Sequence, residues 1–345
     1  MKNLKIGKIK QTTQNKNEYE YRKIEKSYIN EISIQKITYN QLQDFLDLHR
    51  YLSQSELNKL VQKLKAGFNR AVIEKIIAYA DNPMLRVQVP VSFKGIKEVV
   101  AFDLEEEIAL FRYIATMERL IKSNKCNYDN DTIRNLIICG LFTGTRIGEL
   151  GSIDYTKHID FKNKNLIITT TLTKDKNGHI ILGNETKTGR YKKLKGKNDI
   201  RYIPFALFDS AILTHILENQ IKITKENKYN KNNLLFCQKD GQVISHIGIN
   251  SIFKRICREA KIKLELDTGC HFHMTRHTAI TRLIEMGTDP MVIASWVGHT
   301  NTRQIEETYG HILQNFKNWQ LENPGKYYKK EDLITKEVKK LLLNL

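Results

Sequence analysis

The sequence lacks the marks of a secreted or membrane-spanning protein. None of its apolar runs approaches the roughly 18 residues that a membrane-spanning helix needs. The N-terminus, which reads MKNLKIGKIK, has no apolar core of the kind found in signal peptides. The five cysteines are scattered, with no C-x-x-C pair, which argues against a disulfide framework. We therefore expect a cytoplasmic protein whose cysteines are reduced.

Acidic residues are scarce relative to basic ones. The chain has 38 Asp and Glu against 56 Lys and Arg, which gives a net charge of +18. A surplus of this size favours binding to the phosphates of nucleic acid, although lysine-rich soluble proteins without such a partner also exist. With 345 residues, of which 41% are hydrophobic, the chain is long enough for two domains with ordinary cores.

The first 95 residues are predicted to form a helical domain. Apolar residues at helical spacing predict helices over residues 12–29, 40–51 and 55–79. Ser53 or Ser55 can cap the third helix, which we expect to break near Gly67. The basic residues of this helix lie off its apolar stripe. They suit either a solvated face or contacts with DNA phosphates.

Residues 82–100 are predicted to link this domain to a second one over residues 101–325, because Pro83 and Pro90 favour an extended chain. Asp103 opens the first helix of the second domain, which we expect to reach about residue 121. Further helices are predicted over residues 131–142, 207–224 and 247–260, and strands over residues 166–171, 180–182, 185–188 and 200–204. The predicted fold class is therefore mainly α, with a small antiparallel β-sheet in the C-terminal domain.

The stretch from Cys270 to Ile312 concentrates polar side chains that can perform chemistry, including five histidines. Its pattern predicts three short helices: residues 274–286 before Gly287, a second opened by Asp289 and Pro290, and a third capped by Thr302. Sharp corners between short helices can bring distant side chains together. We expect His273, Arg276, His299 and Tyr309 to meet in this way.

An isolated arginine, Arg146, lies near the start of a further short helix. Thr145 can cap this helix, which would place Arg146 at its first position. A helix N-terminus and a guanidinium both favour a bound anion. Glu149, one turn on, can hold the local backbone or Arg146 itself, and a simple salt bridge between the two residues is the alternative reading.

Two blocks of the sequence carry a family resemblance. One runs His273-x-x-Arg276-His277, then Val297-Gly298-His299, then Tyr309-x-His311. The other, from Gly140 to Leu150, reads GLFTGTRIGEL. In this order and spacing they resemble the C-terminal signature and the first arginine motif of the tyrosine recombinases, the phage and conjugative-transposon integrases. The sequence departs from the family's L-G-H pattern only in having Val297 for leucine.

The resemblance implies a site-specific DNA recombinase of the integrase or excisionase type, acting through a 3′-phosphotyrosine without ATP, metal or another cofactor. The implied catalytic residues are Tyr309 as nucleophile, Arg146 and Arg276 on the scissile phosphate, His273 and His299 as hydrogen-bonding and proton-transfer groups, and Lys187 as the acid for the leaving 5′ oxygen. Lys187 matches the family's hairpin lysine. Its neighbours compete for that role: Lys174, Lys176, Lys192, Lys193, Lys195 and Lys197.

The resemblance also implies partners and domains. It implies double-stranded DNA recombination sites, a homo-tetramer on two of them, and room for accessory DNA-bending proteins. The protein would be phage-encoded or associated with a bacterial nucleoid. Residues 1–95 would be a four-helix core-binding domain and residues 101–325 a catalytic domain of the DNA breaking-rejoining type. Residues 326–345 would form a tail helix, which docks either on a neighbouring protomer or on its own domain.

The same residues allow other interpretations. Cys270, His271, His273 and His277 crowd together and could bind zinc, although no second cluster at zinc-like spacing accompanies them. A catalytically silent DNA-binding protein could be built on the same scaffold. A relaxing topoisomerase of the related fold would cut DNA without exchanging partners.

Overall fold

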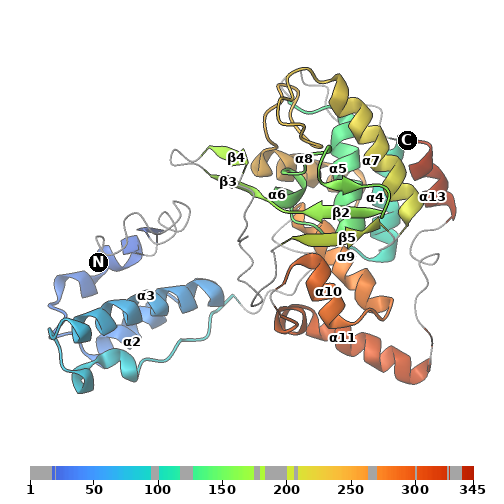
Figure 1. The fold of residues 1–345 in the computed structure, drawn as a ribbon. Coiled ribbons are helices and arrows are strands. Elements are labelled where there is room, and N and C mark those ends of the chain that lie inside the picture. Colours follow the sequence, from blue (N-terminus) through green and yellow to red (C-terminus); the bar gives the residue numbers. More distant parts are fainter. Residues whose placement is uncertain are drawn as a thin grey trace. The chain divides into compact units, whose positions relative to one another are not determined.

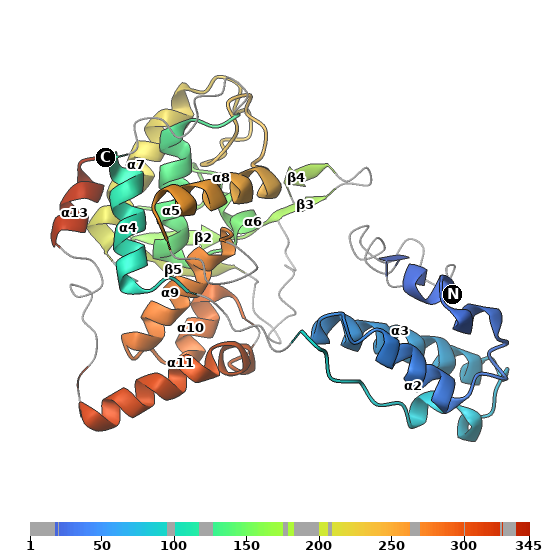
Figure 2. The ribbon, with the colours of Figure 1, turned by 180° about the vertical axis from the view of Figure 1, so that it is seen from behind.

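A computed structural model describes most of the chain (Figures 1 and 2). The described residues are 18–19, 21–94, 101–116, 127–174, 179–182, 200–205, 209–262, 270–299, 301–324, 326 and 336–345. The chain divides into two compact units: one is Met1–Glu98 with Lys174–His179, and the other is Val99–Thr173 with Ile180–Leu345. The described residues of the expected catalytic site all belong to the second unit.

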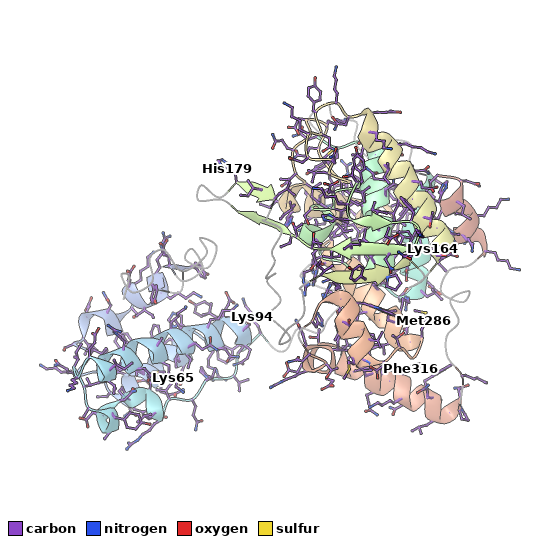
Figure 3. All side chains as sticks on the ribbon, in the orientation of Figure 1. Lys65, Lys94, Lys164, His179, Met286 and Phe316 are labelled. Carbon is purple, nitrogen blue, oxygen red and sulfur yellow. The ribbon has the colours of Figure 1, made fainter. Side chains whose placement is uncertain are left out.

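Two α-helices, α2 (Tyr39–Leu48) and α3 (Gln54–Ile73), form the body of the first unit. Each begins with a capping box, in which Thr38 and Ser53 are the capping residues. The predicted break near Gly67 is wrong, since α3 runs through this position with its apolar stripe buried on either side. The exposed side of α3 carries basic residues such as Lys65 (Figure 3).

Short 3-10 turns complete the first unit: η1 (Tyr28–Glu31), η2 (Tyr79–Asp81) and η3 (Pro83–Leu85). The chain that follows is held against the unit by hydrogen bonds. The Ser92 hydroxyl donates to the Leu52 carbonyl over 2.5 Å, and the Phe93 amide donates to the Arg50 carbonyl over 2.9 Å. The first part of the predicted linker is therefore fixed to this unit, while residues 95–100 lie outside the described part of the chain.

The second unit has a three-stranded antiparallel sheet in the order β1-β2-β5 and a separate β3–β4 pair. The strands are β1 (Ile159–Asp160), β2 (Asn165–Ile168), β3 (Leu172–Lys174), β4 (Ile180–Leu182) and β5 (Arg201–Pro204). In the register of the sheet, Ile168 pairs with Arg201, which fixes where β5 begins. The expected strand over residues 185–188 lies outside the described residues.

Helices make up most of the second unit. They are α4 (Leu104–Thr116), α5 (Asn130–Thr143), α6 (Ile147–Leu150), α7 (Ser210–Glu226), α8 (His246–Glu259), α9 (His273–Glu285), α10 (Pro290–Val297), α11 (Arg303–Glu322) and α13 (Lys336–Leu343). Asp103 opens α4 as predicted: its carboxylate and that of Glu106 each accept a hydrogen bond from the other's backbone N–H, which forms a capping box. The unit is mainly helical with a small antiparallel sheet, as the sequence predicts.

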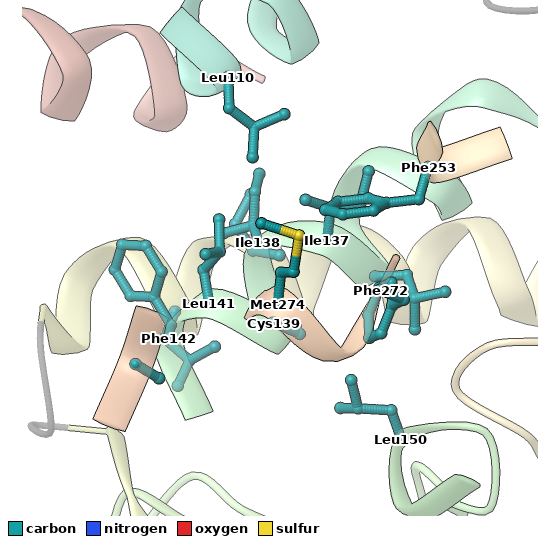
Figure 4. Close-up of a cluster of buried hydrophobic side chains, with 14 of the residues drawn as sticks. Leu110, Ile137, Ile138, Cys139, Leu141, Phe142, Leu150, Phe253, Phe272 and Met274 are labelled. Atoms are coloured by element: carbon teal, nitrogen blue, oxygen red, sulfur yellow. The ribbon is translucent and has the colours of Figure 1, made fainter. Parts of the chain in front are cut away.

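The core of the second unit is centred on α5, which packs against α7 and α9. Side chains such as Leu136, Ile138 and Phe142 are at most 2% exposed. Phe272 and Met274, at the start of α9, belong to the same buried cluster, part of which Figure 4 shows. Each large apolar side chain buried in this way contributes about 1.5–3 kcal/mol to stability. The same packing brings the C-terminal end of α5 against α9, where the candidate site lies.

The last described element, α13, packs on α4 and α7 of its own chain, and both views of the ribbon show it beside them (Figures 1 and 2). Val338 and Leu342 are buried in the core. The Lys339 ammonium is 2.6 Å from a carboxylate oxygen of Asp209. None of the helices in the described part of the chain is both long and apolar enough to span a membrane.

Candidate active site

The turn after α5 places the first arginine. Gly144 ends the helix in a left-handed conformation with φ of +60°, which glycine adopts without strain. The Thr145 hydroxyl turns inward to that of Thr143, 2.7 Å away. Thr145 is therefore not the cap that we predicted. Arg146 itself, with extended backbone, is the N-cap residue of the one-turn helix α6.

A buried carboxylate, Glu149, holds Arg146 in place. It accepts hydrogen bonds from the Arg146 backbone N–H and from Nη1 of the same residue, each over 3.0 Å. It also accepts from Nη2 of Arg201 on β5 over 2.8 Å. Burial alone would raise the pKa of Glu149, but Arg201 and then Arg146 and Arg276 outweigh it and hold this pKa well below its usual range.

The second arginine, Arg276 on α9, is only 2% exposed and meets the first at a shared acceptor. It donates from Nη1 to the Gly144 carbonyl over 2.8 Å and from Nη2 to the Val297 carbonyl over 2.6 Å. Nη1 of Arg146 donates to the same Val297 oxygen over 3.3 Å. The two guanidinium groups thus converge, although 130 positions separate them in the chain. Burial and the charge of Arg146 lower the pKa of Arg276 to about 9, so it stays charged at neutral pH.

His299 follows Gly298, which ends α10 in a left-handed conformation with φ of 71°. Its Nε2 lies 2.9 Å from Nη2 of Arg276. A guanidinium can only donate, so Nε2 accepts and the neutral ring carries its proton on Nδ1. Nδ1 is buried and has no hydrogen-bond partner among the described residues. Burial, followed by the charges of Arg276 and Arg146, lowers the pKa of His299 to about 3.

Tyr309 is 1% exposed and lies in α11 at a kink, where its φ of −119° and ψ of 16° are not helical. We expected a short helix here, but α11 continues past the kink to Glu322. The Tyr309 hydroxyl is 2.6 Å from Nδ1 of His277. Burial raises the pKa of Tyr309 above its ordinary value, and the charge of Arg276 opposes this rise.

His273 lies at the exposed beginning of α9, and its ring meets that of His277 edge-on at 4.7 Å between centroids. Burial of its inner part, followed by the charge of Arg276, lowers the pKa of His273 to about 4. The structure therefore gathers Arg146, Arg276, His273, His299 and Tyr309 around one end of α9. Lys187 lies outside the described residues.

Two residues of this cluster were not predicted to take part. His277 was visible in the sequence one helical turn after His273, and that spacing could have indicated a shared face. Arg201 follows Glu149 by 52 positions with no local signal, and only the strand register brings it to this carboxylate. No three His, Cys, Asp or Glu side chains in the described ranges are arranged to hold a metal ion, which leaves the zinc reading without support.

Comparison with known proteins shows the family of the chain. A sequence profile of the phage integrase family matches residues 115–315, more than half of the chain. The chain belongs to this family. The predicted resemblance to tyrosine recombinases, and with it the enzyme class, is confirmed.

Relatives of known name match most of this tyrosine recombinase. Tyrosine recombinase XerC of Bacillus pumilus is 23% identical, over 76% of this chain and 72% of its own length. The integrase of Staphylococcus phage L54a is 24% identical, over 90% and 86%. The Tn1549 transposon integrase, solved in complex with transposon right end DNA, shares the fold with a TM-score of 0.72 at 21% identity, covering 93% of this chain and 96% of that one. A lambda integrase dimer bound to a COC' core site gives 0.55 at 15% identity, over 86% and 90%.

Proposed function

We propose that this recombinase cuts and rejoins double-stranded DNA at specific sites through a 3′-phosphotyrosine formed on Tyr309. The observation that carries the proposal is the convergence of Arg146 and Arg276 on one backbone oxygen. Tyr309 lies near enough for the charge of Arg276 to act on its phenol. Such an arrangement suits a phosphodiester, whose two non-bridging oxygens need charge neutralisation while a nearby oxygen attacks phosphorus.

The chemical step follows from these positions. The Tyr309 oxygen bonds to phosphorus as its proton passes to His273, and the bond from phosphorus to the 5′ oxygen breaks. Arg146 and Arg276 stabilise the charge that develops on the non-bridging oxygens, to which planar guanidinium groups donate in pairs. His299 offers its unpartnered Nδ1 hydrogen, and His273 at the exposed edge provides a further hydrogen-bonding and proton-transfer group. Lys187 is the proposed acid for the 5′ oxygen.

The reaction as proposed uses neither ATP nor a metal ion. The phosphotyrosine keeps the free energy of the broken phosphodiester bond, and a 5′ hydroxyl from a second DNA strand reverses the step. Two guanidinium groups supply the positive charge that a metal would bring to the phosphate. DNA cut in this way exchanges partners only when two sites are held together.

The proposed partners are two double-stranded recombination sites and three further copies of this chain. Support comes from the net charge of +18 and from relatives solved on DNA, among them a lambda integrase tetramer bound to a Holliday junction. The first unit would be the core-binding domain and the second the catalytic domain. The helix α13, which here packs on its own chain, is the proposed link to a neighbouring protomer in the tetramer.

A nicked DNA substrate tests this function. The substrate is a duplex that carries the DNA flanking the gene, with a nick close to the cleavage point. Cleavage releases the short fragment that bears the 5′ hydroxyl, so the strand cannot be rejoined and the covalent intermediate accumulates. We expect a protein–DNA adduct that survives denaturing electrophoresis and is absent for Tyr309→Phe. Binding without an adduct would support the silent DNA-binding alternative. Cleavage with relaxation of supercoils but no exchange between two sites would support the topoisomerase alternative.

A further inference from the structure

Among the described residues, the Tyr309 hydroxyl has one hydrogen-bond partner, Nδ1 of His277, at 2.6 Å. The two residues are 32 positions apart, on α11 and α9. Tyr309 is 1% exposed, so its hydroxyl is shielded from bulk solvent. A buried hydroxyl that loses its partner costs about 1–3 kcal/mol, so this contact is a strong constraint on where the phenol lies.

The ring of His277 is itself held in orientation. It lies one turn after His273 on α9, with the two rings at 87° to each other. The backbone beneath it is in the buried part of α9, where Thr275, Arg276 and Thr278 are at most 2% exposed. His277 therefore lies on the same helix turn as Arg276, between buried residues of α9, and its own side chain is half-buried.

The protonation state of His277 decides which atom donates. Burial, followed by the charges of His273, His271 and Arg276, lowers the pKa of His277 to about 3, so the ring is neutral at neutral pH. The phenol has a single hydrogen, and Nδ1 is its partner. The arrangement that satisfies both groups puts the ring proton on Nε2 and leaves Nδ1 as the acceptor.

We propose that His277 is a positioning residue for the nucleophile: its unprotonated Nδ1 accepts the phenol hydrogen of Tyr309 and holds the phenolic oxygen within reach of the charge on Arg276. The contact fixes the rotation of the hydroxyl, so the hydrogen points to the histidine and the oxygen lone pairs point elsewhere. A nucleophile held in this way needs less reorganisation before it attacks phosphorus. This inference rests on the proposed function.

The backbone at Tyr309 makes such a restraint necessary. The residue sits at the one non-helical position within α11, so the helix alone does not define its direction. The next residue is Gly310, and a Cβ atom placed on it would have no neighbour within 4 Å. Packing around Gly310 therefore does not restrict the backbone at this point. A side chain on a different, well-packed helix supplies the direction instead.

Three full-length variants test the proposal. In His277→Phe the ring shape is kept but the acceptor is lost. In His277→Asn an amide oxygen takes the place of Nδ1 without a titrating ring. His215→Asn, on α7, is the matched control for loss of a histidine. Single-turnover adduct formation on the nicked duplex is measured over a range of DNA concentrations, to separate the maximal rate from the half-saturating concentration.

We expect His277→Phe to lower the maximal rate about tenfold, the value of one hydrogen bond of about 1.4 kcal/mol, with an unchanged half-saturating concentration. His277→Asn should recover the rate to within about threefold of the wild type. Equal rates for His277→Phe and the wild type, or equal losses in Phe and Asn, would overturn the proposal. An absence of adduct in the wild type would instead count against the proposed function.

A second measurement does not depend on DNA, because it observes the His277 ring directly. In wild-type protein labelled with nitrogen-15 histidine, the His277 signals are assigned by their loss in His277→Asn. We expect the shifts of a neutral ring protonated at Nε2, with an Nδ1 signal that moves in Tyr309→Phe. A ring protonated at Nδ1, or an Nδ1 signal that ignores the tyrosine, would contradict the proposal.

Discussion

The site has two halves that are built differently. In the arginine half, Arg146, Arg201 and Arg276 are held by one buried carboxylate, Glu149, and by backbone carbonyls. In the tyrosine half, Tyr309 sits at a helix kink and is held by one hydrogen bond to His277. The difference follows from what each half does in the proposed reaction. Groups that stabilise developing charge work best when they are fixed beforehand, whereas the phenol is oriented by one contact that it gives up as its oxygen bonds to phosphorus.

The largest effect should come from breaking the arginine half at its centre. In Arg276→Lys the charge is kept. One ammonium group, however, cannot donate hydrogen bonds at once to the Gly144 and Val297 carbonyls and to two phosphate oxygens. We expect adduct formation to slow by about 10²–10³-fold, the usual cost of removing a fixed donor from a transition state. Single-turnover assays on the nicked duplex measure it. A loss smaller than that of His277→Phe would mean that the arginine half is not the principal source of transition-state stabilisation.

The stability of the arginine half depends on its shared carboxylate. Glu149→Gln removes the buried carboxylate that pairs with Arg146 and Arg201, and we expect the free energy of unfolding to fall by about 3–5 kcal/mol. Both tryptophans, Trp296 and Trp319, belong to the second unit, so their fluorescence in urea follows this unit alone. The control is Glu307→Gln, which breaks an exposed pair with Arg303 and should cost less than about 1 kcal/mol. Similar losses in the two variants would contradict the account.

The histidines beside the two halves should make stability depend on pH. His277 and His299 have pKa values of about 3 in the folded protein, below the ordinary 6.5. At pH values between about 3 and 6.5 the unfolded chain binds more protons than the folded chain. The free energy of unfolding therefore falls as the pH falls from about 6.5. The loss is at most about 1.4 kcal/mol per pH unit for each histidine. Urea unfolding at pH 7 and pH 5 should show it, with a shallower dependence in His277→Asn. If the free energy of unfolding changed equally with pH in the wild type and in His277→Asn, the pKa of His277 would not be lowered in the folded protein.

The smallest effects compare a glycine from each half. Gly144→Ala forces a side chain into a left-handed turn and brings its Cβ to 3.3 Å from that of Ala279, so we expect a loss of about 1–2 kcal/mol. Gly310→Ala meets open space and should change stability by less, with a gain of about 0.5 kcal/mol where the backbone is helical. Urea unfolding of the two variants measures the contrast. The opposite order would mean that the tyrosine half is the more tightly constrained.

Much of this fold follows from local signals in the sequence. Apolar spacing and caps at Ser53, Asp103 and Asp289 predict where α3, α4 and α10 begin, because the N-cap interaction is made within one turn. The ends are less predictable. No local pattern in the sequence indicates that α11 continues beyond the kink at Tyr309 to Glu322.

The candidate site divides in the same way. Arg146, Arg276, His299 and Tyr309 could be named from their motifs, and the structure brings them together. Arg201 could not, because its contact with Glu149 depends on the pairing of β2 with β5. Thr145 was misread as a cap because its hydroxyl has a nearer partner in Thr143, a choice that only the folded turn decides.

The most direct test of the account is the identity of the residue that carries the DNA. The adduct from the nicked duplex is digested with protease and nuclease, and the modified peptide is sequenced by mass spectrometry. We expect a nucleotide that is joined through its 3′ phosphate to Tyr309, within the peptide that also contains Gly310 and His311. Attachment to any other of the 15 tyrosines, or through a 5′ phosphate, would contradict it.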